Sequence, residues 1–219
     1  MTIVRTFDRS RGQMLLGLSG RAGSGKDTCA SLLMQQGFRA VAFADALRQE
    51  VAEAWRIDPR MLIDRSTKEW AIPALAIANC VEPTFILTME RLGEDLQVAR
   101  SARWILQRWG TEYRREADSS YWIDRVLERI AKLRAGGWHR ICVTDVRFFN
   151  EAQVIDSLGG AVVRVVRPEL PALEASAAAH PSEAESLPHS GGIVHNDGTL
   201  EQLHLELLRV LEIIGWRQA

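Results

Sequence analysis

The sequence has no excess of charge of either sign and no long apolar run. Its 219 residues include 27 Lys and Arg against 28 Asp and Glu, a formal net charge of −1. A balanced charge provides no global basic field to hold a polyanion, so we expect no nucleic acid as the main partner. No stretch approaches the roughly 20 consecutive apolar residues that span a bilayer, so we expect no membrane association.

Cysteine is scarce, and the few cysteines are not paired. Cys29, Cys80 and Cys142 are far apart and form no Cys-x-x-Cys motif, which is typical of reduced thiols in a cytoplasmic protein. The first eleven positions include Arg5, Asp8, Arg9 and Arg11 and precede any apolar run, unlike a secretory signal. The five histidines show no metal-ligand spacing, and we expect no structural zinc. These features predict a cytoplasmic location.

Short apolar runs alternate with amphipathic segments along most of the chain. The runs that predict strands are residues 14–18, 38–43, 140–144, 161–166 and 193–195. Strand and helix in alternation predict an α/β fold, with a central parallel sheet of about five strands covered by helices on both faces. A chain of this length can bury its core as one domain, and we expect a single domain over 1–219 with its core at about 14–55 and 104–215.

Two segments interrupt this alternation. Residues from about 56 to 103 contain short helical pieces around three prolines, and they predict a helical insertion on the substrate side. Residues 168–192 are rich in Pro, Ala, Ser and Glu and have no apolar period. A loop of this length inside a compact domain is usually either disordered or an active-site lid, and we predict a lid.

A glycine-rich segment links the first predicted strand to the helix that follows it. Glycines let backbone N–H groups curl around an anion, the helix N-terminus adds a favourable dipole, and a lysine here can reach the β- and γ-phosphates of a nucleotide. An ordinary glycine-rich turn is the alternative, but the lysine and the flanking elements favour a phosphate-binding P-loop. The residues predicted to bind ATP here are Gly20, Ala22, Gly23, Ser24, Gly25, Lys26, Asp27 and Thr28.

A carboxylate follows a buried-type strand later in the chain. Asp145 comes after Ile141–Thr144, which is how P-loop enzymes present a group to the Mg²⁺ shell. Strands also end in Asp for turn reasons, but the position after a P-loop favours the metal interpretation. The predicted metal residues are Asp145 and Asp27, acting through water; Asp27 stands where the usual P-loop pattern has Ser or Thr.

The rest of the sequence separates kinases from other P-loop proteins. No Asn-Lys-x-Asp motif is present, and no glutamate follows Asp145 directly, so a GTPase switch and a motor-type ATPase are disfavoured. Asp45 and Arg48 follow the second predicted strand, in an order that resembles nucleoside monophosphate kinases, where the arginine holds the acceptor phosphate. Arg147 resembles the arginine that those enzymes place beyond the later strand. Each arginine alone is as often a solvated surface residue, but their joint place at one sheet edge favours function.

A closer resemblance covers most of the chain, from about residue 14 to 210. The segments that carry it are residues 20–28, 104–112, 121–122, 145–152 and 196–200. Together they resemble the phage-type deoxynucleoside monophosphate kinases, in which the Gly-Lys-Asp-Thr variant of the P-loop also occurs. The resemblance implies a P-loop kinase fold, ATP-dependent transfer to a deoxynucleoside 5′-monophosphate, Mg²⁺ dependence, small-molecule nucleotides as partners and a homodimer.

Further site residues follow from the same segments. Asn196, Asp197 and Gly198 lie where related kinases seat the adenine of ATP, although they also form a good turn before a helix. Arg167 leads into the predicted lid and is a candidate for gripping phosphate, so Lys26, Arg48, Asp145, Arg147 and Arg167 are the predicted catalytic residues.

The predicted substrate contacts beyond Asp45, Arg48 and Arg147 are Arg103, Gln107, Glu112, Trp122 and Glu151. Trp122 lies on an apolar helical stripe, where a core position is slightly favoured over a nucleoside contact. Arg103 and Arg114 either line the acceptor site or are simply exposed.

Two alternatives stay open at this point. Another small P-loop kinase, such as a phosphomevalonate or dephospho-coenzyme A kinase, can carry a similar loop and a similar Asn-Asp-Gly ending. A nucleotide-binding module without turnover is the other alternative. The pairing of Arg48 and Arg147 with a lid-like loop disfavours it, because a sensor needs no second phosphate site.

Overall fold

The computed structural model describes residues 6–8, 12–64, 68–168, 187 and 189–215. The chain forms two compact units, which we describe separately: Met1–Phe43 with Ile123–Ala219, and Ala44–Trp122. The predicted insertion at 56–103 lies within the second unit. Residues 169–186 and 188 of the predicted lid lie outside the described residues.

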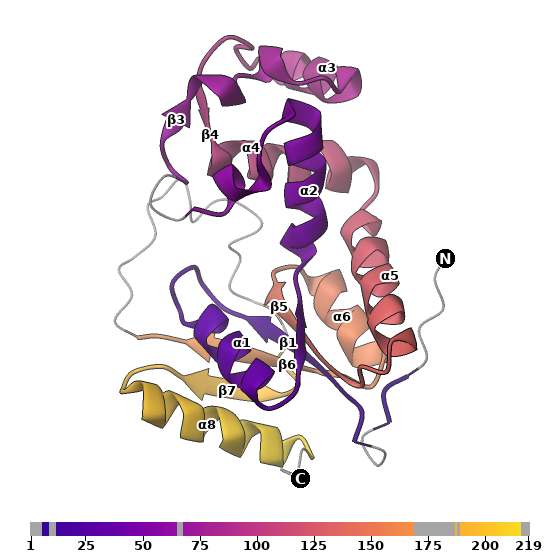
Figure 1. The fold of residues 1–219 in the computed structure, drawn as a ribbon, viewed down its shortest axis with the longest axis vertical. Helices are drawn as coiled ribbons and strands as arrows, with labels where there is room; N and C mark the ends of the chain where they lie inside the picture. Colours follow the sequence, from indigo (N-terminus) through magenta and orange to yellow (C-terminus); the bar gives the residue numbers. More distant parts are fainter. Residues whose placement is uncertain (1–5, 9–11, 65–67, 169–186, 188, 216–219) are drawn as a thin grey trace. The chain divides into compact units, whose positions relative to one another are not determined.

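A five-stranded sheet forms the centre of the first unit (Figure 1). Its strand order is β2-β5-β1-β6-β7, and every neighbouring pair is parallel. The strands are β1 (Met14–Ser19), β2 (Arg39–Val41), β5 (Arg140–Val146), β6 (Ala161–Val166) and β7 (Gly192–His195). The predicted α/β fold with a parallel sheet is confirmed. The strand predicted over 38–43 is wrong in extent, because β2 ends at Val41 and the helix α2 (Phe43–Trp55) begins at Phe43.

Both faces of this sheet are covered, which explains why its central strand β1 is apolar without alternation. All six residues of β1 are buried. Leu16 and Leu18 belong to the core cluster that includes α1 (Lys26–Gln35) and α8 (Leu200–Ile213). Gly17 faces the other way: a Cβ there would lie 2.7 Å from Cδ1 of Ile155 on α6 (Phe149–Ser157), so only glycine lets that helix approach.

The helices of the first unit begin and end where their capping residues allow. Thr199 and Gln202 form the predicted capping box of α8, with Thr199 N donating to Gln202 Oε1 over 2.7 Å and Gln202 N to Thr199 Oγ1 over 3.2 Å. Gly37 follows α1 with a positive φ of 83°, a conformation that glycine adopts without steric cost. Gly137 does the same after α5 (Tyr121–Ala135), with a φ of 86°.

The second unit is built from short pieces around an aromatic cluster. Its elements are α2 (Phe43–Trp55, from Ala44 on), η2 (Pro59–Leu62), β3 (Ala71–Ile72), η3 (Pro73–Leu75), η4 (Ile77–Asn79), α3 (Pro83–Arg91), β4 (Arg100–Ser101), α4 (Ala102–Arg108) and the π-helical turn η5 (Trp109–Arg115). Three of the pieces begin with proline. Proline suits the first helical position because an N–H there would have no intrahelical partner, so its absence costs no hydrogen bond. Rings of Trp55, Phe85, Trp109 and Tyr113 pack together, with the Phe85 and Trp109 centroids 4.8 Å apart.

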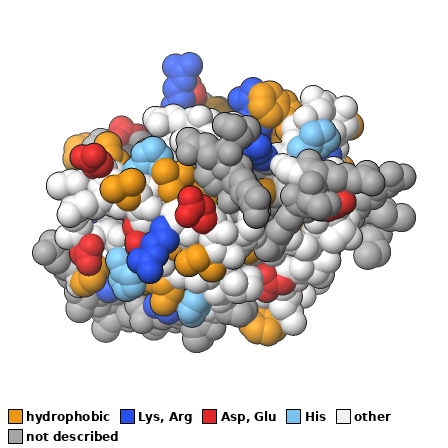
Figure 2. Space-filling model, turned by 90° about the horizontal axis from the view of Figure 1, so that it is seen from below, with side chains coloured by type: hydrophobic (Ala, Val, Ile, Leu, Met, Phe, Trp, Pro, Cys, Tyr) orange, Lys and Arg blue, Asp and Glu red, His pale blue; other side chains and the backbone are white. Residues whose placement is uncertain are grey.

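The surface around α8 is mixed in character. On the face shown in Figure 2, the described hydrophobic side chains are interspersed with charged and histidine side chains and form no single continuous patch. Isolated apolar side chains are normal on a solvated surface. None of the helices in the described ranges is both long enough and apolar enough to cross a membrane.

Candidate active site

The glycine-rich segment forms a tight loop between β1 and α1. Gly20, Gly23 and Gly25 have positive φ angles of 133°, 80° and 103°, which residues with a Cβ rarely adopt. A Cβ on Gly20 would lie 2.3 Å from the carbonyl oxygen of Val165, so the loop also depends on glycine for its close approach to β6. The loop therefore leads from a buried strand directly onto a helix N-terminus.

Lys26, the first residue of α1, reaches back over this loop. Its Nζ donates to the carbonyl oxygens of Gly20 at 2.6 Å and Arg21 at 2.7 Å. Its charge is thus held against the loop at the N-terminal end of α1, where backbone N–H groups and the helix dipole favour an anion. Phosphate oxygens are acceptors of the same kind as these carbonyls, so the ammonium can exchange one set of acceptors for the other.

Ser24 is the buried member of the loop. Its side chain is 1% exposed, and its backbone N–H donates to Arg21 O over 3.1 Å. Within the described part of the chain, its Oγ has no hydrogen-bond partner. A buried hydroxyl without a partner is uncommon in folded proteins. Ala22, Gly23, Asp27 and Thr28 are exposed around it.

Asn196 is the predicted ATP-binding residue that the structure brings to the P-loop. Its Nδ2 donates to the carbonyl oxygen of Ser24 over 2.8 Å, and its backbone N–H donates to Val166 O over 2.8 Å. Asp197 and Gly198 lie in the exposed turn between β7 and α8. The side-chain amide of Asn196 thus binds the backbone of the loop.

Asp145 lies near the same end of the sheet. It is a residue of β5 rather than the residue after it, and the next residue, Val146, is in register with Ser19 at the end of β1. Its Oδ1 accepts a hydrogen bond from the backbone N–H of Phe43 over 2.7 Å. Because carboxyl ends of parallel strands meet at one edge, Asp145, Arg147 after β5, Arg167 after β6 and Asn196 after β7 share the edge where the P-loop begins.

Glu151 has a contact that differs from its predicted substrate role. Its carboxylate is 2% exposed, and Oε2 accepts from the backbone N–H groups of Arg147 at 2.8 Å and Phe148 at 3.1 Å. These bonds satisfy donors before the first turn of α6, as a capping carboxylate does. They give Glu151 the task of fixing the turn that carries Arg147. A direct substrate contact by Glu151 stays a prediction.

Two predicted acceptor residues lie on α2. Asp45 and Arg48 are one turn apart and form an ion pair of 2.6 Å between Oδ1 and Nη2. The sequence predicted them after a strand that ends at residue 43, and Ala44 to Arg48 are already helical. Good helix formers, an acidic residue in the first turn and the Asp145 bond to Phe43 all favour an early helix start.

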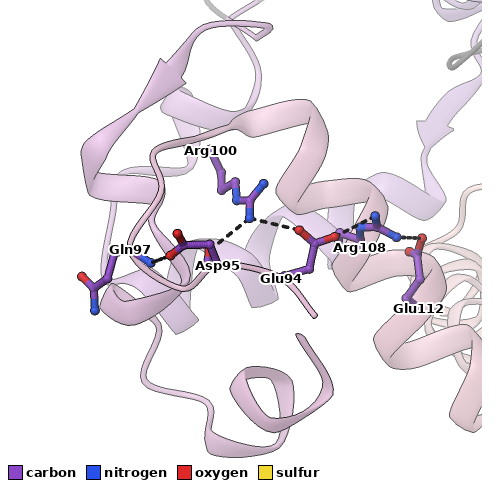
Figure 3. Close-up of polar contacts among 6 residues, drawn as sticks. All are labelled: Glu94, Asp95, Gln97, Arg100, Arg108 and Glu112. Atoms are coloured by element: carbon purple, nitrogen blue, oxygen red, sulfur yellow. Dashed lines mark hydrogen bonds and ion pairs between the residues drawn. The ribbon is translucent and has the colours of Figure 1, made fainter. Parts of the chain in front are cut away.

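Other predicted acceptor residues of the second unit take part in ion pairs. Arg103 Nε pairs with Glu69 at 2.6 Å. Glu112 accepts from Arg108 over 2.7 Å, and Arg108 and Arg100 both bind Glu94, at 2.9 and 3.0 Å (Figure 3). Gln107 is half-buried on α4.

Trp122 takes the core position that its apolar stripe favoured. Its ring is 5% exposed, and its Nε1 donates to Gly110 O over 2.9 Å. The hydroxyl of neighbouring Tyr121 donates to Glu50 Oε1 over 2.5 Å. Both polar groups of this aromatic pair therefore have partners within the unit.

Sequence reasoning missed Glu50 entirely. Besides Tyr121, its carboxylate accepts from Trp109 Nε1 at 3.0 Å and Arg114 Nε at 2.9 Å. The Arg114 guanidinium also lies 4.5 Å from the ring centroid of Tyr113. These partners are 59 to 71 residues away from Glu50 in sequence, so no local sequence pattern predicts the cluster.

The cysteines are unsuited to nucleophilic chemistry. Burial raises the pKa of Cys29 and of Cys80 to about 11, and burial also raises the pKa of Cys142. A thiol reacts as its thiolate, so these three side chains are inert at neutral pH. No group of three or more His, Cys, Asp or Glu is placed to hold a metal within the described ranges.

Comparison with known proteins gives a family match over most of the chain. The family model described as deoxynucleotide monophosphate kinase matches residues 74–207. A protein of Acanthamoeba polyphaga mimivirus named "Putative deoxynucleotide monophosphate kinase" is 26% identical over an alignment 218 positions long, which covers 91% of this chain and 96% of that protein.

Two solved structures resemble the chain at low identity. TT1252 from Thermus thermophilus has a TM-score of 0.49 and 16% identity, covering 92% of this chain and 97% of that one. Dephospho-CoA kinase from Campylobacter jejuni has a TM-score of 0.43 and 14% identity, covering 91% and 96%. Similarities of this size do not bear on the activity.

Proposed function

Because the chain belongs to the deoxynucleotide monophosphate kinase family and is therefore a nucleotide kinase, we propose that it transfers the γ-phosphoryl group of ATP to a deoxynucleoside 5′-monophosphate. The products are the deoxynucleoside diphosphate and ADP. The observation that carries the proposal is the contact of Lys26 Nζ with the Gly20 and Arg21 carbonyls at the start of α1. This contact holds a cation where a helix N-terminus and a glycine-rich loop already favour phosphate.

The P-loop is the proposed donor site. The β- and γ-phosphates of ATP would take the Lys26 ammonium from its two carbonyl acceptors and would meet backbone N–H groups of the loop. The buried Ser24 hydroxyl, which has no partner within the described residues, supports a loop that is completed by its ligand. Asp197 and Gly198 are proposed to border the adenine, and Arg167 to contact the phosphates.

The proposed metal residues fit what Mg²⁺ requires. Mg²⁺ is usually bound by one or two carboxylates together with substrate phosphates and water, rather than by a complete protein cage. Asp145 beside the end of β1 and exposed Asp27 next to Lys26 supply two such carboxylates. Asp145 and Asp27 would hold the Mg²⁺, which when bound would offset the negative charge of the nucleotide phosphates.

The acceptor phosphate needs cations of its own. In the proposed reaction, an oxygen of the monophosphate bonds to the γ-phosphorus, the bridging bond to the β-phosphate breaks, and ADP leaves with the electron pair. Arg48 is proposed to hold the acceptor phosphate, and Arg147, whose backbone is fixed by Glu151, to offset charge on the transferring group. Gln107 is proposed to contact the base, with Arg103 and Glu112 beside it.

A coupled ADP-release assay tests this function. Each of the deoxynucleoside monophosphates is offered with ATP and Mg²⁺, alongside phosphomevalonate and dephospho-coenzyme A. We expect turnover with at least one deoxynucleoside monophosphate and none with the other two acceptors. Turnover confined to phosphomevalonate or dephospho-coenzyme A would contradict the proposed substrate.

A further inference from the structure

Asn196 joins the end of β7 to a loop far away in sequence. Its backbone N–H donates to Val166 O at the end of β6, which fixes the residue to the sheet. Its side-chain amide then donates to Ser24 O over 2.8 Å, across 172 residues of sequence. Asn196 thus connects the sheet, through its backbone, to the P-loop, through its side chain.

The bond is made between two glycines of the loop. Ser24 lies between Gly23 and Gly25, both with positive φ, and glycine has more conformational freedom than any other residue. The contact is so close that a Cβ on Gly25 would lie 2.3 Å from Asn196 Nδ2. Gly25 is therefore required at this position for its backbone conformation and also for the approach of Asn196.

The hydrogen bond to the Ser24 carbonyl also affects the Gly25 N–H, because both groups belong to the same peptide. The Ser24 carbonyl and the Gly25 N–H belong to one planar trans peptide, in which the two groups point in opposite directions. A donor that holds the carbonyl therefore fixes the direction of the N–H. Gly25 is also the N-cap of α1, so this N–H lies at the helix end that favours anions.

We propose that Asn196 is a positioning residue for the phosphates of the bound nucleotide, because it orients the Ser24–Gly25 peptide. This inference rests on the proposed ATP-binding function of the P-loop and assigns Asn196 a role different from the adenine contact that the sequence predicted. The role is independent of the base, since the amide is bonded to the loop backbone.

Direct binding to the full chain tests the proposal. Dissociation constants for ADP are measured for wild type, Asn196→Ala and Asn196→Leu; leucine keeps a branched side chain of similar size without the amide donor. His195→Ala, an exposed neighbour on β7, is the matched control. Loss of one hydrogen bond that orders the loop predicts about tenfold weaker ADP binding for both Asn196 variants and no change for the control.

A ligand without a base separates positioning from adenine recognition. Inorganic tripolyphosphate is used to displace labelled ADP from each protein. We expect the affinity of tripolyphosphate to fall by the same factor as that of ADP, with melting temperatures of the nucleotide-free variants near that of wild type.

Each other outcome has a definite meaning. Unchanged ADP affinity in both variants, a loss for ADP without a loss for tripolyphosphate, or failure of tripolyphosphate to displace ADP from wild type overturns the role of Asn196. Failure of wild type to bind ADP at all overturns the proposed function instead. If one variant is unstable, the other decides.

Discussion

The carboxylate of Asp145 accepts a hydrogen bond from the backbone N–H of Phe43, with 2.7 Å between Oδ1 and N. Phe43 is the first residue of α2, and the first N–H groups of a helix have no partner within it. Asp145 therefore caps α2 from β5. Because the same carboxylate is proposed to serve the Mg²⁺ shell, suitable substitutions should separate the structural role from the chemical one.

Replacement of Asp145 by Asn should affect activity far more than stability. Asparagine keeps an oxygen that can accept the Phe43 N–H but loses the charge, so we expect turnover to fall by roughly 100-fold or more. Asp145→Ala loses both, and a lost cap costs about 1 kcal/mol, which lowers the melting temperature of a chain this size by about 2–4 °C. Thermal melts and ADP release distinguish the two variants.

EDTA should stop the wild-type reaction, and turnover without metal would contradict the Mg²⁺ role.

Lys26→Ala should abolish turnover while the fold survives. The side chain contacts loop carbonyls at the surface end of α1 rather than the core, so its loss should change the melting temperature little. Removal of a cation from phosphate should reduce kcat/KM by at least about two orders of magnitude. Lys132→Ala, an exposed lysine on α5, is the matched control and should behave as wild type. ADP production at the wild-type rate by Lys26→Ala would refute the P-loop assignment.

The sequence predicts the first unit better than the second, for a physical reason. β1 is an apolar run buried on both faces, β5 and β6 have buried apolar runs of three residues, and α8 has both its stripe and its capping box in local sequence. The end of β2 was misplaced because Phe43 is as apolar as a strand residue. Its helical state depends on a cap from Asp145, 102 residues away.

Within the candidate site, the loop was easier to predict than the contacts that individual side chains make. The loop around Lys26 is contiguous in sequence, and its geometry could be expected from glycine and helix chemistry. The contacts of Asn196 with Ser24, of Glu151 with Arg147 and of Glu50 with Arg114 depend on side-chain direction, which no spacing reveals. For Trp122, the apolar stripe correctly favoured the core.

Glu50→Gln should destabilise the protein. Glu50 accepts hydrogen bonds from Trp109, Arg114 and Tyr121, and an amide offers one acceptor oxygen where the carboxylate has two. The loss leaves the half-buried Arg114 without its counter-charge, and we expect a cost of about 1–3 kcal/mol in the free energy of unfolding. Glu53→Gln, an exposed glutamate on α2, is the control. Equal denaturation midpoints for both variants would show that the cluster contributes nothing to stability.

The native cysteines should resist alkylation near neutral pH. With the pKa of Cys29 and Cys80 raised to about 11, only about one thousandth of each thiol is ionised at pH 8. Iodoacetamide should label the denatured chain quickly and the native chain slowly. Mass spectrometry measures the number of alkylated cysteines in each. Because the unfolded thiols ionise near their ordinary pKa of 9.0 while the native ones keep their protons, stability should fall as pH rises past 9. Rapid native labelling of these cysteines at pH 8 would contradict their burial.

Arg48→Ala is the sharpest test of the acceptor, because a nucleoside monophosphate presents a dianionic phosphate away from its base. The Arg48 side chain is 25% exposed and forms an ion pair with Asp45, which is 63% exposed. An exposed pair of this kind contributes little to stability, so the variant should fold normally. Loss of a charged contact to phosphate is worth about 1.5–3 kcal/mol, so KM for the monophosphate should rise by about one to two orders of magnitude.

The KM for ATP separates this role from a general defect. It should change by less than about twofold in Arg48→Ala, since the donor phosphates are proposed to bind at the P-loop. Arg60→Ala, an exposed arginine of the same unit, is the control and should leave both KM values unchanged. A rise in KM for ATP equal to that for the monophosphate would remove Arg48 from the acceptor role. If phosphomevalonate is the acceptor that responds to Arg48→Ala, a phosphate-binding arginine is supported but a nucleotide acceptor is not.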